Sequence, residues 1–92
     1  MDTSFDPAKR AKTLMERGLD FADAKQVFMN TVATAPDTRH DYGEDRFVTA
    51  GYLNGRMVVI VWTPRNGFRH IISMRYCHGR EERVWRRRMG GP

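Results

Sequence analysis

The chain has 92 residues, a hydrophobic content of 40% and a formal net charge of +5, which is the size and composition of one folded domain rather than of a disordered segment. Its single cysteine, Cys77, excludes an internal disulfide, and no apolar run reaches the length of a signal-peptide core or a membrane span. We therefore expect one domain over residues 1–92, located in the reducing cytoplasm and making no membrane contact.

Two helices are expected in the first third of the chain. Asp6 before Pro7 is typical of a helix start, and Gly18 ends that helix after Arg17. Asp20 begins a second helix over residues 21–29. In both segments apolar side chains recur at helical spacing, which predicts that each helix packs one side against a core.

The middle of the chain predicts strands over residues 31–34, 46–53, 56–63 and 68–76. Asn54-Gly55 between two β-rich runs is a strong hairpin signal, so the last three strands are expected to form an antiparallel meander. Strict alternation in the last strand would place Arg69, Ile71, Ser73 and Arg75 together on its solvent face. The arginine-rich segment 80–92 is interpreted as either a terminal helix or a frayed tail.

These elements indicate an α+β fold. We expect two N-terminal helices packed on a three- to four-stranded antiparallel sheet, followed by a short C-terminal helix.

Charge is distributed unevenly along the chain. Residues 1–45 carry six Lys/Arg and nine Asp/Glu, a net charge of −3, whereas residues 46–92 carry ten Arg and two Glu, a net charge of +8. The planar guanidinium of arginine matches phosphate oxygens in pairs. The second half therefore predicts a surface that binds a polyanion, and the alternative is a solvated basic face without a partner.

Four residues are candidates for RNA cleavage without a metal, which requires a proton acceptor and cations that hold the phosphate. His40 and Glu44 can act as acid or base, and Arg46 and Arg75 can clamp phosphate from adjacent strand positions. The alternative is that His40 is an ordinary surface residue and that Glu44 only pairs with neighbouring arginines. Neither the spacing of a metal site nor a Gly-rich cofactor loop is present, so no metal or cofactor is expected.

Trp62, Tyr52 and Tyr76 could stack on bases, although aromatic residues on strands of so small a domain are more often part of the core. For Trp62 we favour packing.

Five stretches resemble, in order, the BrnT toxins: residues 5–9, 18–21, 24–28, 37–47 and 69–75. The block R-H-x-Y-G-E-x-R-F over residues 39–47, followed by the strand R-H-I-I-S-M-R over residues 69–75, is the specific part of the match. The resemblance extends over about residues 5–83. It implies a RelE-like fold and a ribonuclease toxin that halts translation until a BrnA-type antitoxin neutralises it.

The resemblance also implies partners and site residues. Toxin and antitoxin of that family form a complex that represses their own operon, so operator DNA would be contacted only through the antitoxin. Lys9, His40, Glu44, Arg46 and Arg75 occupy motif positions. We assign phosphate stabilisation to Arg46 and Arg75 and proton transfer to His40 or Glu44. Further RNA contacts are expected from Lys9, Arg39, Arg69, Arg80 and Arg83.

The chain departs from the family pattern at two single residues and in one short stretch. Phe5 stands where the family usually has Trp, Thr13 where it has Asn, and Glu16-Arg17-Gly18 where it has Lys-His-Gly. These departures keep a second hypothesis open, a catalytically inactive module of the same fold that binds RNA or DNA. A third reading, compatible with the first, is that the basic face binds an acidic protein partner.

Overall fold

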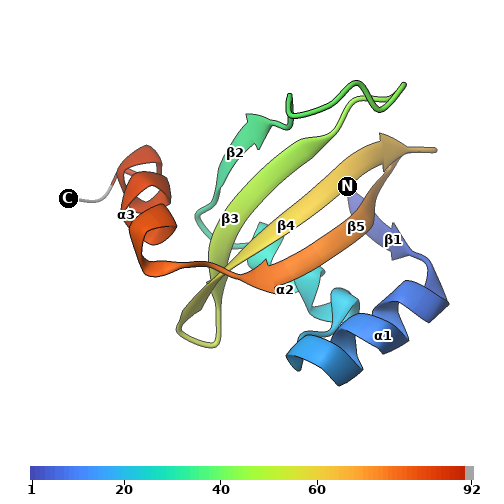
Figure 1. Cartoon of the computed structure of the whole chain (residues 1–92), viewed down its shortest axis with the longest axis horizontal. Coiled ribbons are helices and arrows are strands. Elements are labelled where there is room, and N and C mark those ends of the chain that lie inside the picture. The colour runs from blue at the N-terminus through green and yellow to red at the C-terminus, as the bar shows by residue number, and fades with distance from the viewer. Residues whose placement is uncertain (91–92) are drawn as a thin grey trace.

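A computed structural model describes residues 1–90 and shows a five-stranded sheet with helices on both faces (Figure 1). The strand order is β1-β5-β4-β3-β2, with β1 parallel to β5 and the other neighbours antiparallel. The elements in chain order are β1 (Asp2–Phe5), α1 (Pro7–Arg17), the 3-10 helix η1 (Phe21–Asp23), α2 (Ala24–Phe28), β2 (Ala33–Pro36), β3 (Phe47–Leu53), β4 (Arg56–Arg65), β5 (Phe68–Tyr76) and α3 (Gly79–Arg88).

The predicted arrangement of two leading helices on a three- to four-stranded antiparallel sheet is wrong, because the chain begins with a strand and the sheet is mixed. β1 has only four residues, of which Phe5 alone is a large apolar one. It pairs with a strand that lies more than sixty positions further along the chain, with Ser4 opposite His70. No local turn marks such a parallel pairing, which explains why the sequence did not reveal it.

The boundaries of the first predicted helix and the hairpin turn, which were predicted from neighbouring residues, are confirmed. The Asp6 carboxylate accepts a hydrogen bond from the backbone N–H of Ala8 (2.9 Å), and Gly18 ends α1 in the left-handed conformation with φ of +69°. The Asn54-Gly55 turn joins β3 to β4 with positive φ at both residues. The second predicted helix is divided between η1 and α2. The arginine-rich segment is helical up to Arg88, while residues 91–92 lie outside the described part.

The two faces of the sheet carry separate apolar clusters, one under η1 and α2 and one under α3. Complete burial of a side chain such as Ile60 or Ile71 contributes about 1.5–3 kcal/mol to folding. The larger cluster consists of Leu19, Phe21, Ala24, Val27, Leu53, Val58, Ile60, Trp62, Ile71 and Met74. The smaller one joins Ala50, Met57 and Val59 to the partly buried Val48, Cys77, Trp85 and Met89.

Trp62 belongs to the larger cluster, which confirms the packing interpretation. Its side chain lies against Phe28 and Phe47, and its indole N–H donates to the Thr49 hydroxyl at 2.8 Å. A buried indole with its N–H satisfied is part of the core.

A β-bulge in β5 overturns the predicted faces of that strand. Val61 pairs with Ser73 while Trp62 pairs with Ile71, so Ile72 is an extra residue on β5. Ile71 and Met74, three positions apart, both enter the larger cluster for this reason. The prediction that Arg69, Ile71, Ser73 and Arg75 share one face is therefore wrong, because the alternation is shifted by one residue at the bulge.

Gly51 provides a test of how closely α2 packs on β3. A Cβ added there would lie 2.6 Å from Val27 Cγ1 and 3.0 Å from Val32 Cγ1, and both are buried or partly buried side chains. We expect Gly51→Ala to lower the free energy of unfolding by about 1–3 kcal/mol, the usual cost of overpacking. Urea unfolding followed by tryptophan fluorescence measures it.

Gly79→Ala is the matched control, since a Cβ at that position meets no atom within 4 Å. Its effect should stay within about 0.5 kcal/mol. Equal stability of the two variants would contradict the close packing of α2 on β3.

Candidate functional site

A pocket of about 420 Å³ lies between the sheet and α3, on the face opposite α1 and α2. Valine side chains of β3 and β4 form its floor, and Trp85 of α3 and several charged side chains complete its lining. The charged members are three arginines and two carboxylates: Asp37, Arg39, Arg75, Glu81 and Arg88. The remaining lining residues are Ala35, Pro36, Thr38, Val48, Val59, Val61, Val84 and Trp85.

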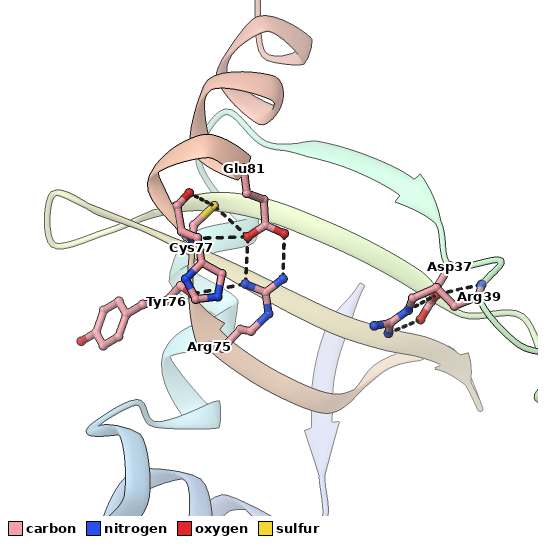
Figure 2. A network of polar contacts seen from close by, with 7 residues as sticks. Asp37, Arg39, Arg75, Tyr76, Cys77 and Glu81 are labelled. Atoms are coloured by element: carbon pink, nitrogen blue, oxygen red, sulfur yellow. Dashed lines mark hydrogen bonds and ion pairs between the residues drawn. The ribbon is translucent and has the colours of Figure 1, made fainter.

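Arg75 of β5 is held by Glu81 from the first turn of α3 (Figure 2). Its Nη1 and Nη2 donate to the two carboxylate oxygens of Glu81 at 2.8 and 2.7 Å. The hydrogen bonds from Arg75 lower the pKa of Glu81 to about 2, although burial acts in the opposite direction. Glu81 is therefore fully ionised near neutral pH, and Arg75 is fixed with its guanidinium at the pocket.

Cys77 lies against the same pair. Its thiol donates to Glu81 at 3.3 Å, and burial, followed by this hydrogen bond, raises the pKa of Cys77 to about 12. A thiol that stays protonated is a poor nucleophile, so Cys77 serves as a structural neighbour of the Arg75–Glu81 pair.

Arg39 is held in the same way on the other side of the pocket (Figure 2). Its Nε and Nη2 donate to Asp37 at 2.9 and 2.8 Å, and the Asp37 side chain is only 1% exposed. These bonds lower the pKa of Asp37 to about 2. The hydrogen bonds to Glu81 raise the pKa of Arg75, and the positive charge of Arg39 acts weakly in the opposite direction because the two guanidinium groups repel each other. With Arg88 the lining carries three guanidinium groups against two carboxylates, a net charge of +1 that favours an anion.

Arg46 and Glu44 lie beside this pocket and are connected to it through Tyr42. The Arg46 guanidinium stacks 3.9 Å from the Tyr42 ring centroid, and the Tyr42 hydroxyl donates to Asp37 at 3.4 Å. Glu44 accepts from Arg46 and from Arg65, both at 3.2 Å. Burial acts to raise the pKa of Glu44, but the two arginines outweigh it and the pKa is lowered.

The sequence suggested that Arg46 and Arg75 occupy adjacent strand positions, but they do not come from adjacent strands. Arg46 immediately precedes β3 while Arg75 is on β5, and β4 lies between the two strands. Any phosphate chain that contacts both must therefore cross β4.

The other predicted RNA-binding residues are dispersed. Arg69 lies on the face that carries α2, with its guanidinium over Phe28 at 4.2 Å, so it is separated from Arg75 on the α3 face. Arg80 and Arg83 are exposed on α3 and line no described pocket. His40 is exposed in the loop before β3, with its ring edge-on to Tyr42. Lys9 is exposed on α1, near enough to His70 to affect its pKa.

His70 is the residue that sequence reasoning missed. It lies in β5 opposite Thr63, half-buried, with Nδ1 3.0 Å from the Ser4 hydroxyl oxygen. The sequence grouped it with Met74 on one face, and only the bulge at Ile72 separates the two. A histidine within an apolar strand gives no local sign that it faces away from the core.

The described residues contain no group of three His, Cys, Asp or Glu side chains placed to bind one metal ion. Nor does any helix among residues 1–90 have the length and apolarity needed to cross a membrane.

Comparison with known proteins assigns the family. The sequence model of the family described as "Ribonuclease toxin, BrnT, of type II toxin-antitoxin system" matches residues 5–81, which is most of the chain. The chain belongs to the BrnT family. A search of curated proteins found no match. Membership confirms the resemblance seen in the sequence, and it implies an RNA substrate and an antitoxin partner for this BrnT-family protein.

Two of the three departures from the family pattern have structural contacts here. Phe5 packs edge-on against Phe21 with ring centroids 6.2 Å apart, and Arg10 lies over its outer face. Arg17 donates from Nη1 to the carbonyl of Met74 at 3.0 Å, which joins the end of α1 to β5. Both residues therefore hold the helical layer to the sheet, on the face opposite the pocket.

The Arg75–Glu81 pair predicts a pH dependence of stability. Because the pKa of Glu81 falls from its usual 4.5 to about 2 on folding, its contribution is fully present above about pH 4.5 and is lost as the pH falls towards about 2. In Glu81→Gln the stability difference from wild type should therefore shrink across this window. Thermal unfolding at neutral pH and at about pH 3 measures it. Asp37 contributes the same pH dependence to the stability of both proteins, so its effect cancels in the difference between them.

Glu16→Gln is the control, because Glu16 faces Lys12 at 4.0 Å on an exposed surface of α1. Its difference from wild type should be close to zero at both pH values. A pH-independent difference for Glu81→Gln would contradict the ion pair.

Proposed function

We propose that this protein is an endoribonuclease that cleaves RNA without a metal ion, and that it thereby inhibits translation. The observation that carries the proposal is the pocket beside α3, where Arg39 and Arg75 are each fixed by a buried or half-buried carboxylate over an apolar floor. Fixed guanidinium groups bind phosphate, and valine and Trp85 surfaces accept a ribose or base.

In this proposal the RNA lies across the face of the sheet that carries α3, beside that helix. Arg75 and Arg39 hold one phosphate in the pocket, and Arg46 holds a neighbouring one, with Glu44 orienting its guanidinium. Cleavage develops extra negative charge on the phosphate oxygens, and guanidinium groups already in place stabilise that charge without reorganisation. The lowered pKa of Glu44 makes it a carboxylate that positions Arg46 rather than a proton donor.

His40 remains a candidate for proton transfer only if the loop that carries it closes over bound RNA. It is exposed, and its ring contacts Tyr42.

We further propose that the antitoxin is of the BrnA type and covers the same pocket. The arginines at the pocket margin are complementary to an acidic segment, and Val84 on α3 presents an exposed apolar side chain beside them. A complex of this kind would contact operator DNA through the antitoxin.

Arg75→Ala tests the catalytic surface directly. Loss of a guanidinium that positions the RNA by holding one of its phosphates should lower kcat/KM for RNA cleavage about 10²-fold. Cleavage of a labelled RNA in the presence of EDTA measures both the effect and the independence from metal, and circular dichroism checks the fold.

Arg56→Ala is the matched control, since it removes one arginine that stacks on Tyr76 at 3.7 Å and lines no described pocket. Its activity should remain close to wild type. Full activity of a folded Arg75→Ala variant would contradict the proposed surface, and RNA binding without any cleavage by wild type would favour the inactive binding module.

Expression in bacteria tests the biological role. Induction of the chain alone should arrest growth and create new RNA ends, and co-expression of the neighbouring gene should abolish both effects. Normal growth without new ends, despite folded protein in the cells, would contradict a toxin.

A further inference from the structure

His70 stands out because a hydroxyl of the neighbouring strand contacts its ring and charged groups of three further segments lie near enough to affect its pKa. β1 supplies the Ser4 hydroxyl, α1 supplies Lys9, β4 supplies Arg65 and the loop before β3 supplies Glu44. Asp6, which caps α1, is the remaining charged neighbour that affects it.

The imidazole is kept neutral by this environment. Burial is the main cause that lowers the pKa of His70 below its usual 6.5, and the positive charges of Arg65 and Lys9 lower it further. Glu44 and Asp6 act in the opposite direction and do not compensate. A neutral imidazole beside cations can accept a proton at physiological pH.

Alternation along β4 places His70 on the same face as the pocket. Val59 and Val61 line the pocket, and Thr63, two residues further, is the partner of His70. Arg75 is the partner of Val59, so His70 and Arg75 lie roughly 13 Å apart along one face, four residues at about 3.3 Å each. A short single strand of RNA can span both.

We propose that His70 is the proton acceptor of RNA cleavage, with Ser4 orienting its ring and with Arg65 of the neighbouring strand holding the scissile phosphate. This inference rests on the proposed ribonuclease function. It assigns the Nδ1–H of His70 as donor to the Ser4 oxygen, which leaves the Nε2 lone pair free. Arg75 and Arg39 then bind a flanking phosphate in the pocket.

The proposed step is a transesterification within the RNA. The 2′-hydroxyl gives its proton to His70 Nε2 while its oxygen bonds to phosphorus, and the bond from phosphorus to the 5′-oxygen breaks. The 5′-oxygen takes a proton from water, and His70 later returns its proton to solvent. The products are a 2′,3′-cyclic phosphate and a 5′-hydroxyl.

The test is His70→Asn, because an asparagine amide can still donate to Ser4 but does not titrate. We expect kcat to fall about 10²-fold or more. The affinity of this variant for an uncleavable 2′-deoxy oligonucleotide, measured by fluorescence anisotropy, should equal that of wild type. Wild type should lose activity as the pH falls through the pKa of His70, and His70→Asn should lack that acid limb.

His78→Asn is the control, since His78 is exposed at the start of α3 and asparagine also suits that helix-cap position. It should keep both the rate and the acid limb. Ser4→Ala should lower kcat while keeping the limb.

Two outcomes would overturn the role of His70 alone: cleavage by His70→Asn with the acid limb intact, or loss of the limb in His40→Asn instead. A wild-type protein that binds the oligonucleotide but cleaves no RNA would overturn the ribonuclease proposal itself, and the role of His70 with it.

Discussion

The extra residue Ile72 in β5 is the constraint on which the candidate site depends. His70 and Arg75 are five positions apart and would point to opposite faces of a regular strand. The bulge shifts the alternation by one, so Ile71 and Met74 both enter the core while His70 and Arg75 both face away from it. Bulges recur beside active sites because they redirect side chains in this way without breaking the sheet.

Pairing with carboxylates then fixes the arginine side chains in position to bind phosphate. An exposed ion pair contributes little to stability, but a guanidinium fixed by two hydrogen bonds has already lost the freedom that phosphate binding would otherwise cost. Asp37 and Glu81 fix Arg39 and Arg75 in this way, and both carboxylates have a pKa of about 2. The Arg75–Glu81 pair also joins α3 to the sheet, which matters because α3 has no fully buried residue. The Arg75–Glu81 pair thus both holds α3 beside the pocket and orients the guanidinium of Arg75.

The sequence predicted what short-range chemistry controls and missed what remote pairing controls. The caps of α1, the Asn54-Gly55 turn and the meander of β3, β4 and β5 follow from residues next to one another. The charge asymmetry pointed to a polyanion, and family membership agrees with RNA as the substrate. β1 was missed because its pairing is remote and its composition polar. His70 was missed because a bulge leaves no signature in composition, so strict alternation placed the histidine on the wrong face.

The two tryptophans allow the central claim to be tested in one NMR spectrum. The claim is that RNA binds on the α3 face of the sheet, where Trp85 lines the pocket, while Trp62 is buried with the opposite cluster. An uncleavable 2′-deoxy oligonucleotide should shift the indole N–H signal of Trp85 and leave that of Trp62 in place. A shift of the Trp62 signal alone, or saturable binding that shifts neither signal, would contradict the account.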